Sequence, residues 1–137
     1  MVGFLGHECG GKLTDSYFSG DVVPTYNGQY AGLVAGVSSE GICGRCVGIG
    51  TIHRPTNGVS ASGLGGVVGG IQGTIMKDCY FAGNLETSGT RTGAIVGVAL
   101  NAYDMEGHRN QNELTNVYAS GVFKSTSTGA YMRYIGK

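Results

Sequence analysis

Charged side chains are scarce in this sequence. Lys, Arg, Asp and Glu make up 13% of the 137 residues, and nine basic residues balance nine acidic ones. Binding to nucleic acid or anionic lipid needs a basic surface, which this balance does not supply. Long apolar runs are also missing, because glycine interrupts each run before the roughly 18 residues of a membrane span. We therefore expect no nucleic acid as a partner and no insertion into a membrane.

Proline is also rare, with two residues, whereas glycine is abundant, with 27. The glycines follow no Gly-X-Y period, which excludes a collagen-like helix. Long α-helices are disfavoured as well, since each glycine inside a helix costs about 1 kcal/mol relative to alanine. The composition favours short strands joined by many tight turns.

An internal repeat of roughly 30 residues runs through the chain. A Gly-x-x-Gly-like tetrad opens each copy: Gly3–Gly6, Gly32–Ala35, Gly66–Gly69 and Ala94–Gly97. A second element, which ends in an aromatic residue, a glycine and an apolar residue, follows in most copies. We expect a single domain, residues 1–137, divided into repeats at about 2–31, 32–64, 65–92 and 93–128, with a partial copy at 129–137.

Each repeat holds three short strand candidates separated by Gly, Ser, Thr and Asn turns. No copy can bury its inner face alone, so we expect the copies to stack about 4.8 Å apart with equivalent side chains in columns. The predicted columns are Leu5/Val34/Val68/Val96, Leu13/Cys43/Met76/Leu114, Ser16/Cys46/Cys79/Val117 and Val22/Ile52/Leu85/Phe123. The sequence thus predicts an all-β parallel β-helix, or β-solenoid, of about four to five coils with roughly 30 residues per coil.

The repeat resembles the GLUG motif, in which a Gly-Leu-x-Gly core is followed by an Asn-Cys-Tyr-like element and Gly-x-Val. The matching segments are Gly3-Phe4-Leu5-Gly6, Gly66-Val67-Val68-Gly69, Asp78-Cys79-Tyr80 with Gly83, and Asn116-Val117-Tyr118 with Gly121. The resemblance implies a right-handed coil and a β-helical stalk or adhesive region of a bacterial surface protein. Some secreted metallopeptidases contain such repeats, but the sequence has no His-Glu-x-x-His signature, so only the repeat region is implied.

These features favour a non-catalytic structural or adhesive module, located outside the cell or on its surface. The expected partners are adjacent repeats, a second copy of the chain, or glycans and host or matrix proteins. One alternative is a self-assembling filament or fibre subunit that stacks head to tail. Another is a carbohydrate-active β-helix enzyme. Residues 1–11 lack the charged start and apolar core of an export signal.

Cysteines and carboxylates are the side chains that could carry chemistry. Cys43-Gly44-Arg45-Cys46 is a C-x-x-C pair, which suits a redox pair or half of a zinc site completed by His7, Cys9 or Cys79. Because both cysteines occupy column positions, we expect packed, unbonded thiols, with no metal and no cofactor. Asp15 and Asp78 share one repeat position, and Arg45 lies between them, so we expect surface acids rather than a catalytic pair.

Two groups of residues are candidates for ligand binding. The longest insertion, residues 101–113, is polar, and insertions in repeat proteins often carry the binding residues. Its candidate residues are Tyr103, Asp104, Glu106, His108, Arg109 and Glu113. The second group is a stacking ladder of Tyr17, Tyr80 and Tyr118, which share one repeat position and could stack on sugars if they face outward.

Overall fold

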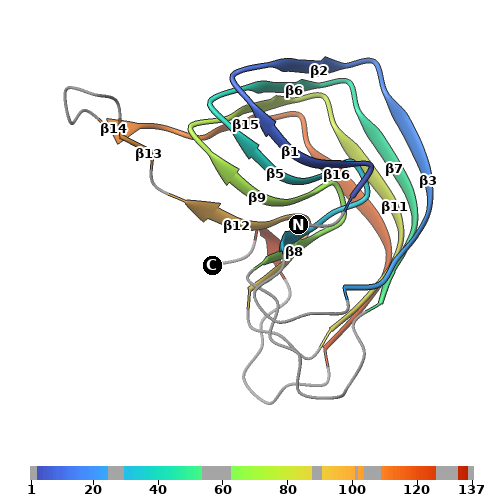
Figure 1. Ribbon diagram of the computed structural model, residues 1–137. Helices are drawn as coiled ribbons and strands as arrows, with labels where there is room; N and C mark the ends of the chain where they lie inside the picture. The colour runs from blue at the N-terminus through green and yellow to red at the C-terminus, as the bar shows by residue number, and fades with distance from the viewer. Residues whose placement is uncertain are drawn as a thin grey trace.

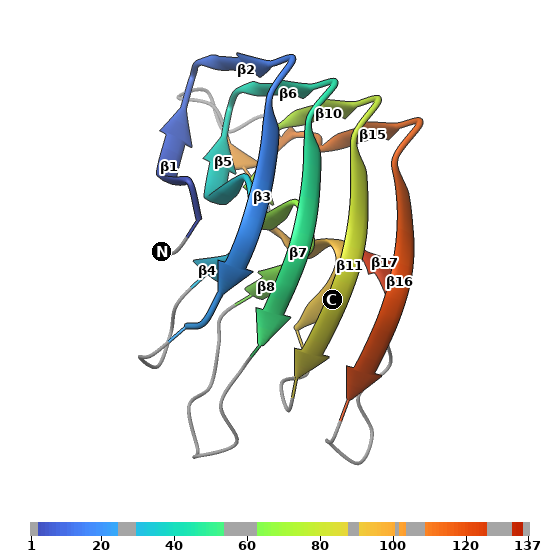
Figure 2. The same cartoon turned by 90° about the vertical axis from the view of Figure 1, so that its right-hand side faces the viewer.

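The computed structural model describes residues 3–24, 30–53, 63–87, 91–100, 102–103, 109–125 and 133–135. These residues form an all-β structure in which three parallel sheets enclose one core (Figure 1). Strands from successive repeats lie next to one another in each sheet, so the repeats are stacked (Figure 2). The described residues contain no helix of the length and apolarity that a membrane crossing requires.

Sheet A is the largest of the three, with seven strands. It consists of β1 (Leu5–Cys9), β4 (Tyr30–Ala31), β5 (Ala35–Ser39), β8 (Gly63–Gly65), β9 (Val68–Gln72), β12 (Thr92–Leu100) and β17 (Arg133–Ile135). Its strand order is β1-β5-β9-β12-β8-β4, and β17 also pairs with β12. The long strand β12 pairs with β8 near its start and with β9 further along, which bends the sheet into a half-barrel.

Sheets B and C each have four strands, one from each repeat. Sheet B has the order β15-β10-β6-β2, formed by Glu113–Thr115, Ile75–Lys77, Ile42–Gly44 and Lys12–Thr14. Sheet C has the order β16-β11-β7-β3, formed by Tyr118–Ser125, Tyr80–Thr87, Val47–His53 and Tyr17–Val22. A two-stranded antiparallel hairpin, β13 (Ala102–Tyr103) with β14 (Arg109–Asn110), stands apart from these sheets (Figure 1).

The prediction of a single right-handed β-helix of four to five coils is wrong. The strands form three separate parallel sheets, and one of them is a half-barrel. A repeat pattern specifies which strands pair, but it does not specify how far a sheet curves. The second and third repeats break their sheet A strands at residues 32–34 and 66–67, whereas β12 continues without a break and joins both halves of the sheet.

The strand registers confirm two of the predicted columns in full. Leu13, Cys43, Met76 and Leu114 pair in succession across sheet B. Val22, Ile52, Leu85 and Phe123 do the same across sheet C. A third predicted column, Ser16/Cys46/Cys79/Val117, lies one residue before sheet C. The backbone carbonyls of its first three members accept hydrogen bonds from backbone amides of the next repeat.

The predicted column Leu5/Val34/Val68/Val96 is wrong at one position. Leu5 pairs with Ala35, which pairs with Val68, which pairs with Val96. Val34 is one residue out of step, and its amide bonds to the carbonyl of Val67. The repeats should be aligned on the last glycine of the tetrad, which is Gly6 in the first repeat and Gly69 in the third. The equivalent residue of the second repeat is Gly36, not Ala35.

Residues in the left-handed conformation make the corners between sheets B and C. Asp15, Arg45, Asp78 and Asn116 occupy equivalent positions and have φ values of 55°, 50°, 54° and 52°. Asp and Asn adopt this conformation more readily than most residues, because their short polar side chains bond to nearby groups. Each corner turns the chain between a short sheet B strand and the start of sheet C.

The core is fullest in the middle of the stack. The largest fully buried side chains include Phe81, Leu85 and Met76 of the third repeat and Ile52 of the second. Partly buried apolar residues cover this core at both ends: Leu5, Leu13, Phe18 and Val22 in the first repeat, and Leu114, Val117, Ala119 and Phe123 in the last. The two end layers therefore leave apolar surface uncovered.

Candidate functional site

The outward side of sheet C is the most distinctive surface of the described structure. Side chains alternate between the two sides of a strand. Phe81 and Leu85 are fully buried, so Tyr80, Ala82 and Asn84 point the other way, toward solvent. Figure 2 looks onto this side, with β3, β7, β11 and β16 next to one another. We call it the sheet C face.

Three rows of equivalent residues run across the sheet C face, perpendicular to the strands. The rows are Tyr17/Val47/Tyr80/Tyr118, Ser19/Ile49/Ala82/Ser120 and Asp21/Thr51/Asn84/Val122. The stacking-ladder residues Tyr17, Tyr80 and Tyr118 thus share one row, with Val47 between Tyr17 and Tyr80. The Tyr80 hydroxyl lies 2.5 Å from Ser120 Oγ, which fixes the central ring against the neighbouring strand.

The sheet C face exposes large apolar side chains to solvent. Tyr17 and Tyr118 are 63% and 62% exposed, Val122 is 51% exposed and Ile49 is 37% exposed. Val23, directly after β3, is exposed as well. Of the remaining exposed large apolar residues in the described structure, Ile75 lies on sheet B and Phe4 precedes β1. Such a concentration on one sheet, with polar groups between, is typical of a binding surface.

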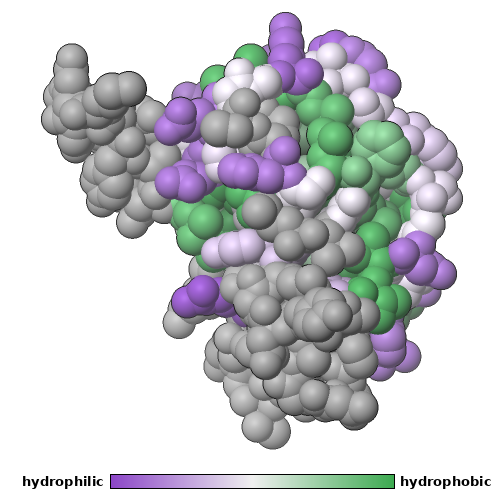
Figure 3. Space-filling view, viewed as in Figure 1, coloured by the Kyte–Doolittle hydropathy of each residue, from purple (hydrophilic) through white to green (hydrophobic). Residues whose placement is uncertain are grey.

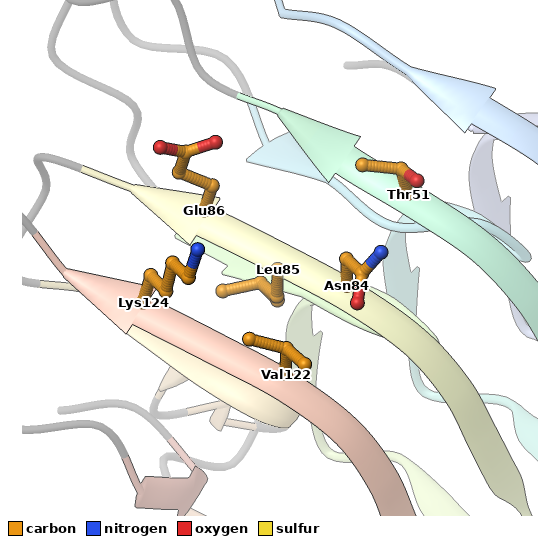
Figure 4. Close-up of a pocket in the computed structure, with 6 residues that line it drawn as sticks. All are labelled: Thr51, Asn84, Leu85, Glu86, Val122 and Lys124. Carbon is orange, nitrogen blue, oxygen red and sulfur yellow. The ribbon is translucent and has the colours of Figure 1, made fainter.

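A hollow lies toward the carboxyl-terminal ends of the sheet C strands (Figure 4). It has a volume of about 260 Å³ and is lined by Thr51, Asn84, Leu85, Glu86, Val122 and Lys124. Asn84 and Val122 lie further from the strand ends than Glu86 and Lys124, which are the second-to-last residues of β11 and β16 (Figure 4). The hollow therefore offers an amide, a hydroxyl and two opposite charges beside an apolar side chain.

The carboxylates Asp15 and Asp78 lie in the row of left-handed corners and are held by neighbours. Arg45 bonds to both oxygens of Asp15, which lowers the pKa of that carboxyl below its ordinary value. Asp78 accepts a bond of 2.9 Å from the side-chain amide of Asn116. A carboxylate that is kept ionised by an arginine is poorly suited to be a general acid.

The cysteines form a buried cluster between sheets B and C. The Sγ atoms of Cys43, Cys46 and Cys79 lie within 4.8 Å of one another, and the Cys43 and Cys79 sulfurs are 3.9 Å apart. All three are free thiols, and they are almost completely buried. Hydrogen bonds from Cys43 and Cys79 lower the pKa of Cys46, whereas the hydrogen bond to Cys46 raises that of Cys43. The predicted column Ser16/Cys46/Cys79/Val117 had already placed Cys79 next to Cys46, and the structure adds the contact between Cys79 and Cys43.

Among the insertion candidates that the structure describes, only Tyr103 and Arg109 are brought together. Tyr103 and Arg109 pair with each other in the β13–β14 hairpin, and Glu113 begins β15 with its side chain exposed. Asp104, Glu106 and His108 lie outside the described residues. Asn112 anchors the strand end of this insertion, since its side chain bonds to the Leu100 carbonyl and the Thr74 amide.

Several residues of the sheet C face were missed from the sequence. Thr51, Asn84 and Val122 each lie directly before a member of the predicted column Val22/Ile52/Leu85/Phe123, and Ile49 lies two residues after Val47. The signal was available in the sequence. A residue directly before an inward-facing column member such as Ile52 or Leu85 should face outward, and so should a residue two positions from the row of tyrosines. Alternation along a strand would have placed them outward with Tyr80.

No family model, no curated protein and no solved structure matches the chain.

Proposed function

We propose that the chain is a non-catalytic structural and adhesive module that binds extended glycans through the sheet C face. The observation that carries this proposal is the gathering of exposed apolar side chains on one sheet, with Tyr17 and Tyr118 each more than 60% exposed. Tyrosine rings present an apolar face that stacks on sugar rings and a hydroxyl that forms hydrogen bonds. We further propose that the module works at the cell surface or outside the cell, as the GLUG resemblance implies.

The geometry of the rows supports an extended ligand. Neighbouring strands lie about 4.8 Å apart, close to the length of one sugar residue in an extended polysaccharide. A glycan that lies across the strands could stack its sugar rings along the tyrosine row. Ser19, Ser120 and Asn84, in the adjacent rows, offer hydroxyl and amide groups to the sugar hydroxyls. Stacking would supply affinity, and these polar groups would supply orientation.

A glycan array followed by calorimetry with the best glycan tests the proposal. We expect Tyr118→Ala and Tyr17→Ala each to weaken binding about tenfold, which corresponds to about 1.4 kcal/mol. Ile75→Ala is the matched control, since Ile75 is exposed on sheet B, away from the sheet C face. Equal loss in all three variants, or a folded protein that binds no glycan on the array, would contradict the proposal. Binding to a matrix protein alone, lost in the tyrosine variants, would replace glycan by protein as the ligand.

The non-catalytic part of the proposal has its own test. The acids best placed by sequence for hydrolysis are Asp15, which is paired with Arg45, and Glu113, which is exposed on β15. We expect no breakdown of polysaccharide substrates by the purified chain. Cleavage that disappears in Asp15→Ala or Glu113→Ala would instead identify a carbohydrate-active enzyme.

A second function, the subunit of a head-to-tail filament, is favoured by the two ends of the stack. Phe4 is 70% exposed, and its ring centroid lies 4.3 Å from that of the partly buried Phe18 at the first-repeat end. Figure 3 looks onto this end and shows hydrophobic surface beside hydrophilic residues. Strands β3 and β16 are the two edges of sheet C, and each edge strand offers backbone groups to another strand.

Light scattering and electron microscopy test the filament. We expect particles that grow with protein concentration, and we expect Phe4→Lys to shorten them. Ile75→Lys, which adds the same charge on the side of the stack, is the control and should leave assembly unchanged. A monodisperse monomer at high concentration would rule out the filament and leave the adhesive module as it stands.

A further inference from the structure

The buried cysteine cluster has the composition of a soft-metal site. Cys43 is the middle residue of β6 and Cys46 directly precedes β7, so the two flank one corner of the second repeat. Cys79 directly precedes β11 at the equivalent corner of the third repeat. All three Sγ atoms lie within 4.8 Å of one another, with Cys43 and Cys79 at 3.9 Å. The second and third repeats therefore both contribute sulfur atoms to one cluster.

Met76 is a fourth sulfur-containing residue at these two neighbouring positions of the second and third repeats. It pairs with Cys43 across sheet B, just as Cys79 stacks on Cys46, and it is fully buried. The second repeat thus supplies C-x-x-C and the third supplies M-x-x-C at the same positions. The corresponding residues in the first and fourth repeats are Leu13 with Ser16 and Leu114 with Val117. The sulfur ligands are confined to the middle of the stack.

The sulfur spacing suits a metal ion with little rearrangement. A metal bound at about 2.3 Å from each thiolate requires sulfur atoms about 3.8 to 4.0 Å apart, for tetrahedral and trigonal arrangements respectively. The Cys43–Cys79 separation of 3.9 Å already meets this requirement. The longest separation in the group, at most 4.8 Å, would have to shorten by at most about 1 Å. Rotation of a single cysteine side chain can provide this change.

The thiols form only weak bonds that a metal would replace. Cys46 donates to the carbonyls of Leu13 and Gly44 at 3.6 and 3.4 Å. Cys79 donates to the carbonyls of Cys43 and Lys77, both at 3.4 Å. Metal binding releases the protons of the thiols that become ligands.

We propose that Cys43, Cys46 and Cys79 bind one Cu(I) ion, with the thioether of Met76, which pairs with Cys43 across sheet B, as an additional soft donor. Thiolate and thioether sulfur select soft ions such as Cu(I). A structural zinc site needs four ligands, and the cluster among the described residues has no fourth cysteine, no histidine and no carboxylate. Cu(I) is satisfied by two or three sulfur ligands. The ion would join the second and third repeats, so it would stabilise the stack independently of any ligand on the sheet C face.

Anaerobic titration of the reduced chain with Cu(I), in competition with a chromophoric Cu(I) chelator, tests this proposal. The Cys9→Ser background is used, so that the three clustered cysteines are the chain's only thiols. We expect one Cu(I) per chain, a near-ultraviolet thiolate-to-copper charge-transfer band, and a higher thermal midpoint. Cys79→Val and Cys43→Ala should each weaken binding at least 100-fold, and Met76→Leu about tenfold.

The controls separate a true site from adventitious binding. Zn(II), titrated in the same way, should bind more weakly than Cu(I), because the group lacks a fourth ligand. Ser16→Ala, at the equivalent corner of the first repeat, should leave Cu(I) affinity unchanged. If a substituted chain does not fold, titration of the unsubstituted chain decides alone. Substoichiometric Cu(I), tighter binding of Zn(II), or full affinity in a folded Cys79→Val chain would overturn the proposal.

Discussion

The guanidinium of Arg45 contacts both carboxylate oxygens of Asp15, one repeat away, with Nε 2.5 Å from Oδ1 and Nη2 2.6 Å from Oδ2. Both residues occupy the left-handed corner between sheets B and C. The pair therefore connects equivalent positions of two stacked repeats on the outside of the molecule. Asp78 and Asn116 repeat the same contact with a neutral partner.

This ion pair predicts the titration of Asp15. The hydrogen bonds from Arg45 lower the pKa of Asp15 below its ordinary value of 3.8. Any stability that the pair adds is present above pH 3.8 and is lost as the pH falls through the lower pKa of the folded state. Arg45→Gln should return the pKa of Asp15 toward 3.8, as measured by carbon NMR of its carboxyl group. Lys77→Gln removes a cation two repeats away and should not change it.

The stability effect of that pair should nevertheless be small. Both side chains are about 60% exposed, and water screens exposed ion pairs strongly. We therefore expect urea unfolding of Arg45→Gln at neutral pH to match the unsubstituted chain closely. A large loss of stability would mean that the corner depends on the ion pair, rather than on its backbone conformation.

Gly83 is expected to be hard to replace, like the equivalent residues Gly50 and Gly121 of sheet C. Its φ is +156°, and a Cβ atom there would lie 1.9 Å from the Gly50 carbonyl oxygen of the neighbouring strand. Gly83→Ala should therefore lower the free energy of unfolding by about 3 kcal/mol, from backbone strain and overpacking together. Gly6→Ala is the matched control in β1, where nothing lies within 4 Å of the added atom. Denaturant unfolding should separate the two variants clearly.

Side-chain periodicity made two columns predictable, and it failed where the landmark was ambiguous. Leu13, Cys43 and Met76 are found in register because each begins the same apolar-polar-polar element. Val34 was placed one residue out, because two glycines, Gly32 and Gly36, compete as the landmark of the second repeat. Only the hydrogen-bond register across the sheet distinguishes these two alignments.

The curvature of sheet A could not be read from the repeat. Strand β12 continues through residues 94–96, whereas the second and third repeats have breaks at the equivalent place, although the second repeat also has no glycine at residues 33–35. Whether one strand pairs with two partners depends on long-range packing, which single-sequence patterns do not encode. The repeat did place Cys79 on Cys46 in one predicted column, but it could not show that the Cys43 sulfur lies 3.9 Å from the Cys79 sulfur.

Leu85 and Leu13 provide a test of the stacked core. Leu85 is fully buried in the third repeat, whereas Leu13 is only partly buried at the first-repeat end. Leu85→Ala should cost about 2 to 5 kcal/mol, the range for a fully buried leucine. Leu13→Ala should cost less than half as much, because the end of the stack already admits water. Similar losses in thermal or urea unfolding would mean that another chain covers the first-repeat end in solution.

The last prediction concerns the turn that follows β1, β5 and β9, because one of the three repeats has a different residue type there. Gly10 and Gly73 occupy this turn with φ values of 66° and 60°, whereas the second repeat has Glu40 there, at 55°. A side chain in the left-handed conformation costs about 1 kcal/mol, and the greater freedom of glycine in the unfolded chain offsets part of that cost. Glu40→Gly should therefore raise the free energy of unfolding slightly, by about 0.5 kcal/mol.

Gly10→Ala gives the reverse experiment, since an added Cβ there meets no atom within 4 Å. Its cost, about 1 kcal/mol, would come from the backbone conformation alone. Gly10→Asn should cost less than Gly10→Ala, because asparagine tolerates the left-handed conformation. Urea unfolding of the three variants should therefore rank them as Glu40→Gly, Gly10→Asn and Gly10→Ala, from most to least stable. A Gly10→Ala chain as stable as the original would mean that the turn at the first repeat relaxes to a right-handed conformation, and that glycine is not required there.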